Sequence, residues 1–428
     1  MADHDLDFRI EQLGDCQFLS PMMGARFIDG GSRILYHSQY EELQPFIDAG
    51  IEPPTLELAG PRERIFFDPA ETSCGIVTCG GLCPGINNVI RAVVMSLYYH
   101  YGVRRIYGFR YGFEGLVKRH GHEPFVLTPE EVNDIGELGG TILSSSRGPQ
   151  DPAEMVDYLM ECGINILFAI GGDGTLKGAA AIVTEARRRD LPLSVIGIPK
   201  TIDNDISFMQ MTFGFETAVA EAQRAIDAAH AEATGTRNGI GLVKLMGRDS
   251  GFIAAYATLV NGQVNFCLVP EVPFTLEGLM RSLSFRLEQR GHAVIVVAEG
   301  AGQDLLAATE KRDPSGNIKL GDIGIWLRDA IRQSFAQGRE VTVKYIDPSY
   351  IIRSQPANSH DAAFCLLLGH NAVHAGMSGR TNIVVGVWND KLVHVPISLA
   401  TLERKRIDSH GWVWSSVLAS TGQSGEIL

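Results

Sequence analysis

"INILFAIGGDGTLKGAAAIVTEARRRDLPLSVIGIP", residues 164–199, contains two short apolar runs on either side of a segment of helical length. Apolar runs without polar alternation are typical of strands that are buried on both faces of a parallel sheet. The segment between them, Thr175 to Arg189, has the length and the mixed polarity of a surface helix. The stretch therefore predicts a strand, a crossover helix and a second, parallel strand.

The same alternation extends in both directions along the chain. Apolar runs recur before and after this stretch, with helical segments between them; the runs are 74–78, 104–109, 239–245, 265–270, 293–300 and 341–347, and the segments are 87–99, 213–233 and 276–289. We therefore expect an α/β fold with two parallel-sheet, Rossmann-like lobes, a cleft between the lobes, and an N-terminal extension. The expected boundaries are 1–70 for the extension, 71–212 for the first lobe with a return near 382–405, 213–381 for the second lobe, and 406–428 for a C-terminal tail.

Composition limits the classes of function. The 428 residues are 45% hydrophobic and 20% charged, with a net charge of −13, so no basic surplus is present to neutralise nucleic acid or an anionic membrane. The first residues lack the features of a secretory signal, and no apolar run approaches the ~18 residues of a membrane helix. We expect a soluble, cytoplasmic protein whose seven cysteines are reduced. Zinc binding by Cys79 and Cys83 is disfavoured because no second ligand pair has suitable spacing.

Glycines follow the first predicted strand of the first lobe. The stretch "CGGLCPG", residues 79–85, places Gly80 and Gly81 directly after the strand and before a helix. Glycine lets the backbone approach an anion, and a helix N-terminus offers unpaired N–H groups. A plain tight turn is the alternative, because the spacing matches neither a Walker A motif nor GxGxxG.

A second glycine-rich strand end adds a carboxylate. "GGDGT", residues 171–175, contains Gly172, Asp173, Gly174 and Thr175 between a buried strand and a helix. A carboxylate beside bound phosphate requires a bridging cation, and Mg²⁺ meets that need with few protein ligands. This strand end therefore predicts a nucleotide and magnesium, with a simple helix-capping role for Asp173 as the alternative.

The third strand end is the most highly charged. "PKTIDND", residues 199–205, places Asp203 and Asp205 two residues apart, which in extended backbone puts both carboxylates on one face about 7 Å apart. Two like charges at that separation need a cation, or one carboxyl must be protonated. We favour a role in handling phosphate, metal and a proton over a polar surface turn.

Together with "KLMGRDSGF", "VAEG" and "YIDPSYIIR", these segments resemble those of 6-phosphofructokinases in order and approximate spacing, over about residues 73–400. The resemblance is greatest to the longer branch, which is related to the pyrophosphate-dependent enzymes, includes ATP-using members and carries an N-terminal extension. It implies a glycolytic enzyme that phosphorylates the 1-hydroxyl of fructose 6-phosphate. Lipid and NAD kinases share "GGDGT" but have no counterpart of the other motifs.

The resemblance also implies roles for individual residues. Asp203 would be the general base, Asp173 and Asp205 would hold magnesium, and Arg248 would offset charge in the transition state. Thr201, Lys200 and the amides of Gly80 and Gly81 would contact the transferring phosphoryl group. Arg147, Gly172, Gly174 and Thr175 would contact the nucleotide. The sugar phosphate would be bound by Thr201, Asp203, Asp205, Met246, Gly247, Arg248, Glu299, Lys344, Tyr350 and Arg353.

Two residues bear on the phosphoryl donor and favour different answers. Gly174 leaves room for the α-phosphate and adenosine, whereas Lys200 is typical of pyrophosphate users. Steric exclusion is harder to evade than an added charge, so we expect ATP, with a pyrophosphate-dependent enzyme as the alternative. A non-catalytic regulatory subunit is a further alternative, although such a subunit is expected to lose its base and Asp203 is present.

The shorter bacterial enzymes differ at several matching positions. Where they have an arginine and a histidine for the sugar 6-phosphate, this chain has Lys344 and Tyr350, which can still donate hydrogen bonds to phosphate. Their arginine from a neighbouring subunit corresponds to Gly239, with Arg237 nearby. Because the family completes its sugar-phosphate site with a neighbour, we expect a homo-oligomer, a homotetramer rather than a homodimer.

Overall fold

The computed structural model describes residues 6–307, 311, 312, 318–425 and 427. Contacts divide the chain into two compact units. The first unit is drawn from Met1–Thr201, Ile206–Gly214 and Pro356–Glu403, and the second from Ile202–Asp205, Phe215–Gln355 and Arg404–Leu428. Each unit is built around its own sheet.

The sheet of the first unit has nine strands, and its centre is parallel. In spatial order the strands are β3 (Arg33–Leu35), β4 (Thr55–Leu58), β17 (Lys391–Pro396), β16 (Ile383–Trp388), β10 (Ser194–Pro199), β9 (Ile166–Gly171), β6 (Ser73–Thr78), β7 (Arg105–Phe109) and β8 (Phe125–Val126). The strands from β16 to β7 are parallel to one another, and the outer strands pair antiparallel. Two small antiparallel pairs join β1 (Glu11–Gln12) to β15 (Arg380–Thr381) and β2 (Phe18–Leu19) to β5 (Arg64–Ile65).

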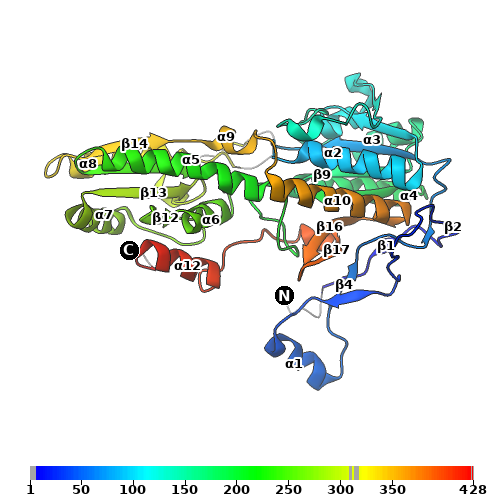
Figure 1. The fold of residues 1–428 in the computed structure, drawn as a ribbon, viewed down its shortest axis with the longest axis horizontal. Helices are drawn as coiled ribbons and strands as arrows, with labels where there is room; N and C mark the ends of the chain where they lie inside the picture. Colours follow the sequence, from blue (N-terminus) through cyan, green and yellow to red (C-terminus); the bar gives the residue numbers. More distant parts are fainter. Residues whose placement is uncertain (1–5, 308–310, 313–317, 426, 428) are drawn as a thin grey trace. The chain divides into compact units, whose positions relative to one another are not determined.

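Helices cover both faces of this sheet, since alternate residues of a strand point to opposite sides. Leu167 and Ala169 pack in a core cluster with α3 (Pro152–Glu161) and α4 (Asp173–Arg188). On the other face, α10 (Ser359–Met377) approaches Ile166 and Phe168 closely at Gly376. Figure 1 shows α10 beside α2 (Ile86–Met95). The unit also contains η2 (Ser96–Tyr101), η3 (Gly112–Leu116), η4 (Lys118–His120), η5 (Ile135–Glu137) and α11 (Ile397–Ala400).

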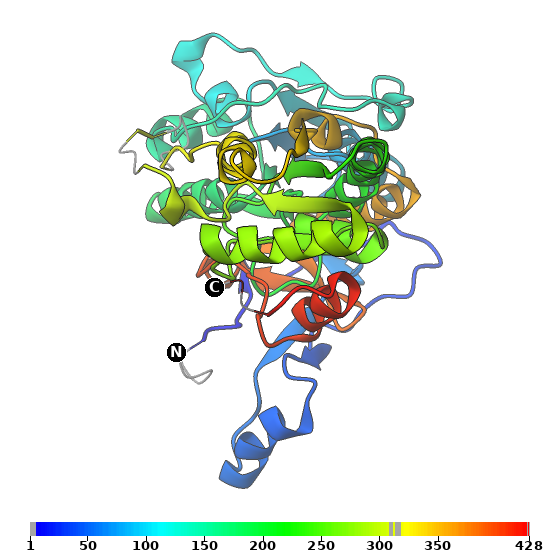
Figure 2. The same cartoon turned by 90° about the vertical axis from the view of Figure 1, so that its left-hand side faces the viewer.

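The second unit has a four-stranded, fully parallel sheet. Its order is β12 (Phe266–Leu268), β13 (His292–Ala298), β11 (Gly239–Leu245) and β14 (Thr342–Ile346). Its helices are α5 (Phe215–Thr234), α6 (Phe252–Val260), α7 (Leu276–Arg290), η6 (Gln303–Leu305), α8 (Ile323–Phe335), α9 (Ser349–Arg353) and α12 (Trp412–Thr421). α7 and α8 share an apolar core with one face of the sheet. α5 packs on the other face, where Ala229 contacts Gly241. Figure 2 shows these helices, coloured green to yellow. Among the described residues no helix is both long and apolar enough to cross a membrane.

The predicted α/β class with parallel sheets in two lobes is confirmed. Each apolar run from 74–78 to 341–347 overlaps a strand of one of the two sheets, and the run 239–245 coincides with β11. The helix predicted over 87–99 is instead α2 followed by the π-helical turn η2, a change of winding that periodicity cannot reveal. α10, which the predicted boundaries placed in the second lobe, packs on α2 and β10 in the first unit. The predicted cleft stays a prediction.

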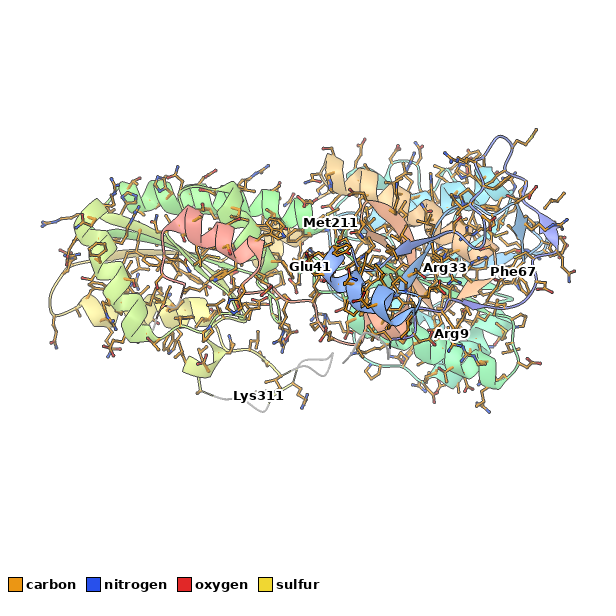
Figure 3. The ribbon with its side chains drawn as sticks, turned by 90° about the horizontal axis from the view of Figure 1, so that it is seen from below. Arg9, Arg33, Glu41, Phe67, Met211 and Lys311 are labelled. Atoms are coloured by element: carbon orange, nitrogen blue, oxygen red, sulfur yellow. The ribbon has the colours of Figure 1, made fainter. Side chains whose placement is uncertain are left out.

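The segment preceding residue 70 contributes to the first unit's sheet. β4 pairs with β17 and β3 pairs with β4, so the extension lengthens one edge of the sheet. α1 (Tyr40–Ala49) lies between these two strands in sequence and projects away from the body of the first unit in Figures 1 and 2. Figure 3 marks Arg33 on β3 and Glu41 on α1.

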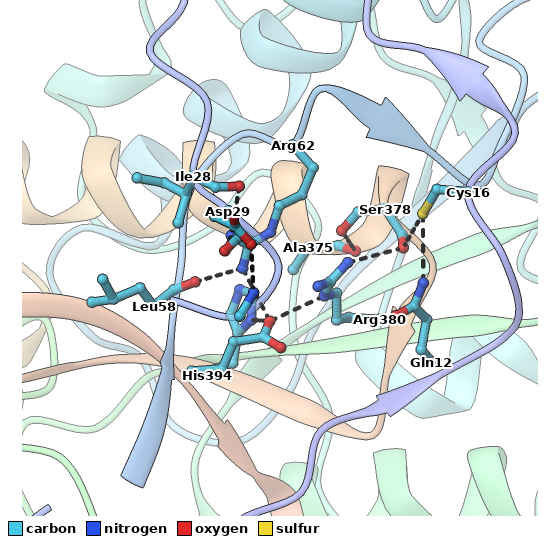
Figure 4. Close-up of polar contacts among 12 residues, drawn as sticks. Gln12, Cys16, Ile28, Asp29, Leu58, Arg62, Ala375, Ser378, Arg380 and His394 are labelled. Atoms are coloured by element: carbon cyan, nitrogen blue, oxygen red, sulfur yellow. Dashed lines mark hydrogen bonds and ion pairs between the residues drawn. The ribbon is translucent and has the colours of Figure 1, made fainter. Parts of the chain in front are cut away.

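A buried ionic cluster fastens the extension to the core (Figure 4). Glu57 of β4 accepts hydrogen bonds on Oε1 from Arg62 at 3.1 Å, Arg380 at 3.1 Å and His394 Nδ1 at 2.8 Å. Arg62 also donates to the carbonyls of Ile28, Asp29 and Leu58. Burial opposes the charge on Glu57, but the bonds and charges of His394 and Arg380 overcome it and lower the pKa of Glu57 to about 2.

Candidate active site

The three polar strand ends of the first unit leave neighbouring strands. β6 and β10 both pair in parallel with β9, with Thr78 opposite Ile170 and Gly171 opposite Pro199. Parallel strands in register bring their carboxyl ends to one edge of the sheet, where α/β proteins bind ligands. The loops beginning at Cys79, Gly172 and Lys200 therefore start side by side.

The first loop holds Gly80 in a conformation that other residues rarely adopt. Gly80 has a φ of +88°, its N–H donates to the Ser146 carbonyl at 3.0 Å, and its carbonyl accepts from Ser145 Oγ at 2.7 Å. Lys200 Nζ donates to the carbonyl of Gly81 at 2.7 Å. The first and third loops are thus linked directly, and an ammonium group lies at the glycines.

The second loop opens α4. Gly172 is the N-cap, so Asp173 is the first residue of the helix, and its carboxylate lies 3.1 Å from Lys177 Nζ. Thr175 is buried, with its N–H donating to Gly172 O at 2.9 Å. A Cβ placed on Gly174 would meet no atom within 4 Å. The beginning of α4 therefore offers amide donors, one carboxylate and open space beside Gly174.

Three further predicted residues of the first unit differ in exposure. Lys200 is buried, with 5% of its surface exposed, whereas Arg147 is exposed and follows the Ser146 that is bonded to Gly80. Thr201 is half-buried, and its carbonyl accepts from Thr212 Oγ1 at 2.7 Å. The structure thus anchors the backbones of Arg147 and Thr201 next to the glycine loops.

In the second unit, residues 203–205 form an acidic loop. Asn204 has a left-handed backbone, with φ of +53°, between the two aspartates. Burial, followed by the negative charges of Asp205 and Glu299, raises the pKa of Asp203 well above its usual value. Asp205 forms an ion pair with Arg404. The loop therefore combines the Asp203 carboxyl group, which resists ionisation, with the Asp205 carboxylate, which is paired with the positive charge of Arg404.

The loops after β11 and β13 approach each other closely. Glu299 N–H donates to Leu245 O at 2.9 Å and Gly300 N–H to Gly247 O at 3.0 Å. A Cβ on Gly300 would lie 1.8 Å from the carbonyl oxygen of Arg248, so only glycine fits there. Burial raises the pKa of Glu299, although the charges of Lys244 and Arg248 oppose the shift. The structure therefore brings Arg248 and Glu299 together, with half-buried Met246 beside Gly247 in sequence.

The remaining sugar-phosphate candidates occupy two places. Tyr350 and Arg353 lie on α9, where the Arg353 guanidinium is 4.8 Å from the Tyr350 ring centre and Tyr350 is 73% exposed. Lys344 lies opposite Gly241 in the sheet, four residues before β11 ends, and its Nζ is 2.9 Å from a Glu232 oxygen on α5. The structure thus brings Tyr350 and Arg353 together, whereas Lys344 pairs with Glu232.

Sequence reasoning missed three cationic residues beside these groups. Lys244 bonds Asp347 at 2.8 Å and Asp322 at 3.2 Å, and its charge acts on Glu299. Arg404 and Lys405 contact the acidic loop, and burial lowers the pKa of Lys405 to about 7. Lys244 was recognisable as the one charged residue of the apolar run "GIGLVKL", and the run "ERKRID", residues 403–408, signalled the other two.

The predicted magnesium ligands have suitable chemistry but do not form a protein-only site. Among the described residues, no group of three or more His, Cys, Asp or Glu side chains is arranged to hold a metal ion. Asp173 and Asp205 are each paired with a cationic side chain. Mg²⁺ commonly takes one or two carboxylates and completes its shell with phosphates and water, so these residues fit an ion that arrives with a phosphate ligand.

Comparison with known proteins identifies relatives. The model of the family described as "Phosphofructokinase" matches residues 73–376. The "ATP-dependent 6-phosphofructokinase" of Borreliella burgdorferi is 47% identical, covering 99% of this chain and 98% of that protein. The protein of the same name from Amycolatopsis methanolica is 47% identical over 100% and 97% of the two chains, and the one from Trypanosoma cruzi is 46% identical over 96% and 87%.

Solved structures agree in fold. The pyrophosphate-dependent phosphofructokinase of Marinobacter aquaeolei superposes with a TM-score of 0.69 at 19% identity, covering 82% of this chain and 91% of that one. Saccharomyces cerevisiae phosphofructokinase gives 0.62 at 22% identity over 82% and 48%. Identities this low show the fold alone. The family match and the full-length relatives establish more than fold: this chain belongs to the phosphofructokinase family.

Proposed function

We propose that this chain is an ATP-dependent 6-phosphofructokinase, which transfers the γ-phosphoryl group of ATP to the 1-hydroxyl of fructose 6-phosphate in glycolysis. Relatives of nearly the same length and 46–47% identity carry that name. The observation that carries the proposal is the set of three neighbouring strand ends in the first unit, which present glycine amides, Lys200 and Asp173 at one edge. Phosphoryl transfer depends on such positioned donors and cations more than on covalent chemistry.

The first unit would bind the phosphoryl donor. The Gly80–Gly81 loop would surround the transferring group, although the Gly80 N–H already donates to the Ser146 carbonyl, and Lys200, bonded to the Gly81 carbonyl, would add positive charge. Gly172, Gly174 and the Thr175 side chain would contact the remaining phosphates at the N-terminus of α4, where the helix dipole favours an anion. Arg147, exposed beside the Gly80 loop, would contact the nucleotide phosphates.

The second unit would supply the base. Asp203 would take the proton of the 1-hydroxyl as the sugar oxygen bonds to the γ-phosphorus and the bond from that phosphorus to the ADP oxygen breaks. Burial and neighbouring carboxylates raise the pKa of Asp203, which strengthens it as a base once it is ionised. Arg248 would offset negative charge in the transition state. Glu299, Met246, Gly247, Tyr350 and Arg353 would orient the sugar phosphate.

Magnesium would be bound through Asp173 and Asp205, together with phosphate oxygens. When bound, the ion would neutralise charge on the transferring phosphates. Lys177 and Arg404 already pair with these two carboxylates, so the metal would share or replace those contacts.

ATP use is supported by Gly174. Its Cβ position is open, so the α-phosphate and adenosine would meet no side chain there. A coupled assay with fructose 6-phosphate and either ATP or pyrophosphate tests the proposal. Activity with ATP is expected; activity with pyrophosphate alone would favour the other donor class, and no activity with either would favour a regulatory subunit.

We propose further that the enzyme is a cytoplasmic homo-oligomer. A homotetramer is favoured, with a homodimer as the alternative. Support comes from Lys344, which lies about 13 Å before the carboxyl end of the sheet by four residues of strand rise. Its register sets this lysine back from the strand ends that carry Arg248 and Glu299. We therefore propose that Lys344 contacts a sugar phosphate bound by a second copy.

A further inference from the structure

The chain segment between α11 and α12 contacts the acidic loop at two consecutive residues. The Lys405 N–H donates to Asp205 O at 3.0 Å, and Lys405 Nζ donates to Asn204 Oδ1 at 3.1 Å. Arg404 pairs with the Asp205 carboxylate. Residues 404 and 405 therefore bind the backbone, the amide and one carboxylate of a three-residue loop.

The same segment is fastened to the loop that carries Arg248. Ser250 Oγ donates to the carbonyl of Lys405, and Ile407 N–H donates to Glu271 Oε1 at 2.9 Å. The Glu271 carboxylate also accepts from the Gly251 N–H at 3.0 and 3.1 Å. Residues 404–407 thus connect the acidic loop with the loop after β11, and all of these groups belong to the second unit.

The acidic loop needs such support for two physical reasons. Asn204 has a left-handed backbone, a sparsely populated conformation that persists only where its surroundings enforce it. Asp203 and Asp205 repel each other, which opposes any arrangement that keeps their carboxylates close. The Lys405 ammonium group, bonded to the Asn204 side chain, stabilises the left-handed backbone of Asn204. Its positive charge also offsets the repulsion between the aspartates on either side. The Lys405 ammonium group also lies over the Phe252 ring, with Nζ 5.2 Å from the ring centre.

We infer that Arg404 and Lys405 position the acidic loop for phosphoryl transfer, and that Lys405 sets the direction of the Asp203 carboxylate through its bond to Asn204. This inference rests on the proposed function. Neither Arg404 nor Lys405 is placed on a substrate atom, so they are positioning residues rather than catalytic ones. Their effect should fall on the rate of the bound complex, because misplacement of a reacting group by about 1 Å can cost about 100-fold in rate.

The test uses substitutions that remove one bond and keep the local shape. Lys405→Met retains the stem beside Phe252 and removes the ammonium group; Asn204→Gly retains access to the left-handed backbone and removes Oδ1. Each is expected to lower kcat about 10- to 100-fold, with the KM values for ATP and fructose 6-phosphate changed less than about threefold. The double variant should be no slower than the worse single variant, because both changes break the same bond. Arg406→Met, at an exposed neighbouring cation, is the matched control and should retain parental kcat.

Hydrogen–deuterium exchange of substrate-free protein supplies a readout independent of activity. Backbone amides of residues 203–208 should exchange at least about tenfold faster in Lys405→Met than in the parent or in Arg406→Met. Unchanged exchange, unchanged kcat, or fully additive losses in the double variant would each overturn the inference. If the parent lacked phosphofructokinase activity, the proposed function would fail while the exchange experiment still tested the contact.

Discussion

At the scale of single residues, the proposed base Asp203 is also expected to lower the stability of the fold. Its raised pKa means that the fold disfavours its ionised form, as expected of a group kept for chemistry. Asp203→Ser is expected to lower kcat by about 100-fold or more, with KM changed much less, because removal of a general base costs 10²–10⁴. The melting temperature should stay the same or rise, since a carboxylate near Asp205 and Glu299 is removed. Steady-state kinetics with thermal unfolding checks both, and a retained kcat would exclude Asp203 as the base.

Gly174 permits a second test, because the fold accepts a side chain there. A Cβ meets no atom, and an acidic residue in the first turn of α4 is favourable for the helix. Gly174→Asp should therefore fold normally, yet raise the KM for ATP by about tenfold or more through repulsion of the α-phosphate. Gly174→Ala is the control, which tests space without charge and should change the KM much less. An ATP KM that is equal in parent and Asp variant would refute the role of Gly174.

At the scale of elements, the sequence predicted the strands well because each is a short apolar run followed by glycine or charge. β6, β9, β10 and β11 each match a predicted run to within a few residues at either end. The sequence did not predict features that depend on contacts between distant residues. The π-helical turn after α2 and the placement of α10 in the first unit are decided by packing between segments that periodicity does not relate.

The site residues stay predictions, but the structure shows which of them lie together. The loops after the adjacent parallel strands β11 and β13 bring Arg248 and Glu299 together, whereas Asp203 follows β10 of the other sheet and was grouped with them only by the family resemblance. Lys344 was grouped with them by motif, but its register opposite Gly241 separates it from the strand ends. Lys405 was missed because its partner Asn204 lies 201 residues away in sequence and no local pattern connects the two.

The attachment of β4 to β17 predicts a pH-dependent stability. Glu57→Gln leaves Arg62 and Arg380 without their shared carboxylate, and breaking a buried pair in this way costs about 3–5 kcal/mol. Because the folded pKa of Glu57 is about 2, below its ordinary 4.5, its stabilisation is complete above pH 4.5 and is lost as the pH falls toward 2. The free energy of unfolding of the parent should therefore fall toward that of the variant as the pH drops below 4.5.

The control for this change is the same substitution at an exposed pair. Glu71 lies 3.4 Å from Arg105 and is 82% exposed, so Glu71→Gln should cost less than about 1 kcal/mol. Chemical denaturation of the three proteins at several pH values gives the comparison. A stability gap between parent and Glu57→Gln that stayed constant from pH 6 to pH 3 would contradict the role of the Glu57 charge.

At the scale of the whole molecule, the proposed assembly ties activity to association. If each sugar-phosphate site needs a neighbour, its phosphate donors are in place only while that partner is bound. Light scattering should then report a homo-oligomer, a tetramer by our proposal, and specific activity should fall on dilution as subunits separate. A monomer with full activity at assay concentration would rule out this arrangement.

Lys344 offers a direct test of sharing between copies. Its pairing with Glu232 on α5 and its register away from Glu299 make it a candidate to serve a neighbouring copy rather than its own. Lys344→Ala and Asp203→Ser should each be nearly inactive alone, yet co-expression should restore activity. In a random mixture with equal amounts, half of the chains keep Asp203 and half of their neighbours keep Lys344, so recovery of about a quarter of parental activity is expected for a closed, symmetric oligomer. Mixed oligomers no more active than either variant alone would place Lys344 in its own subunit's site or in none.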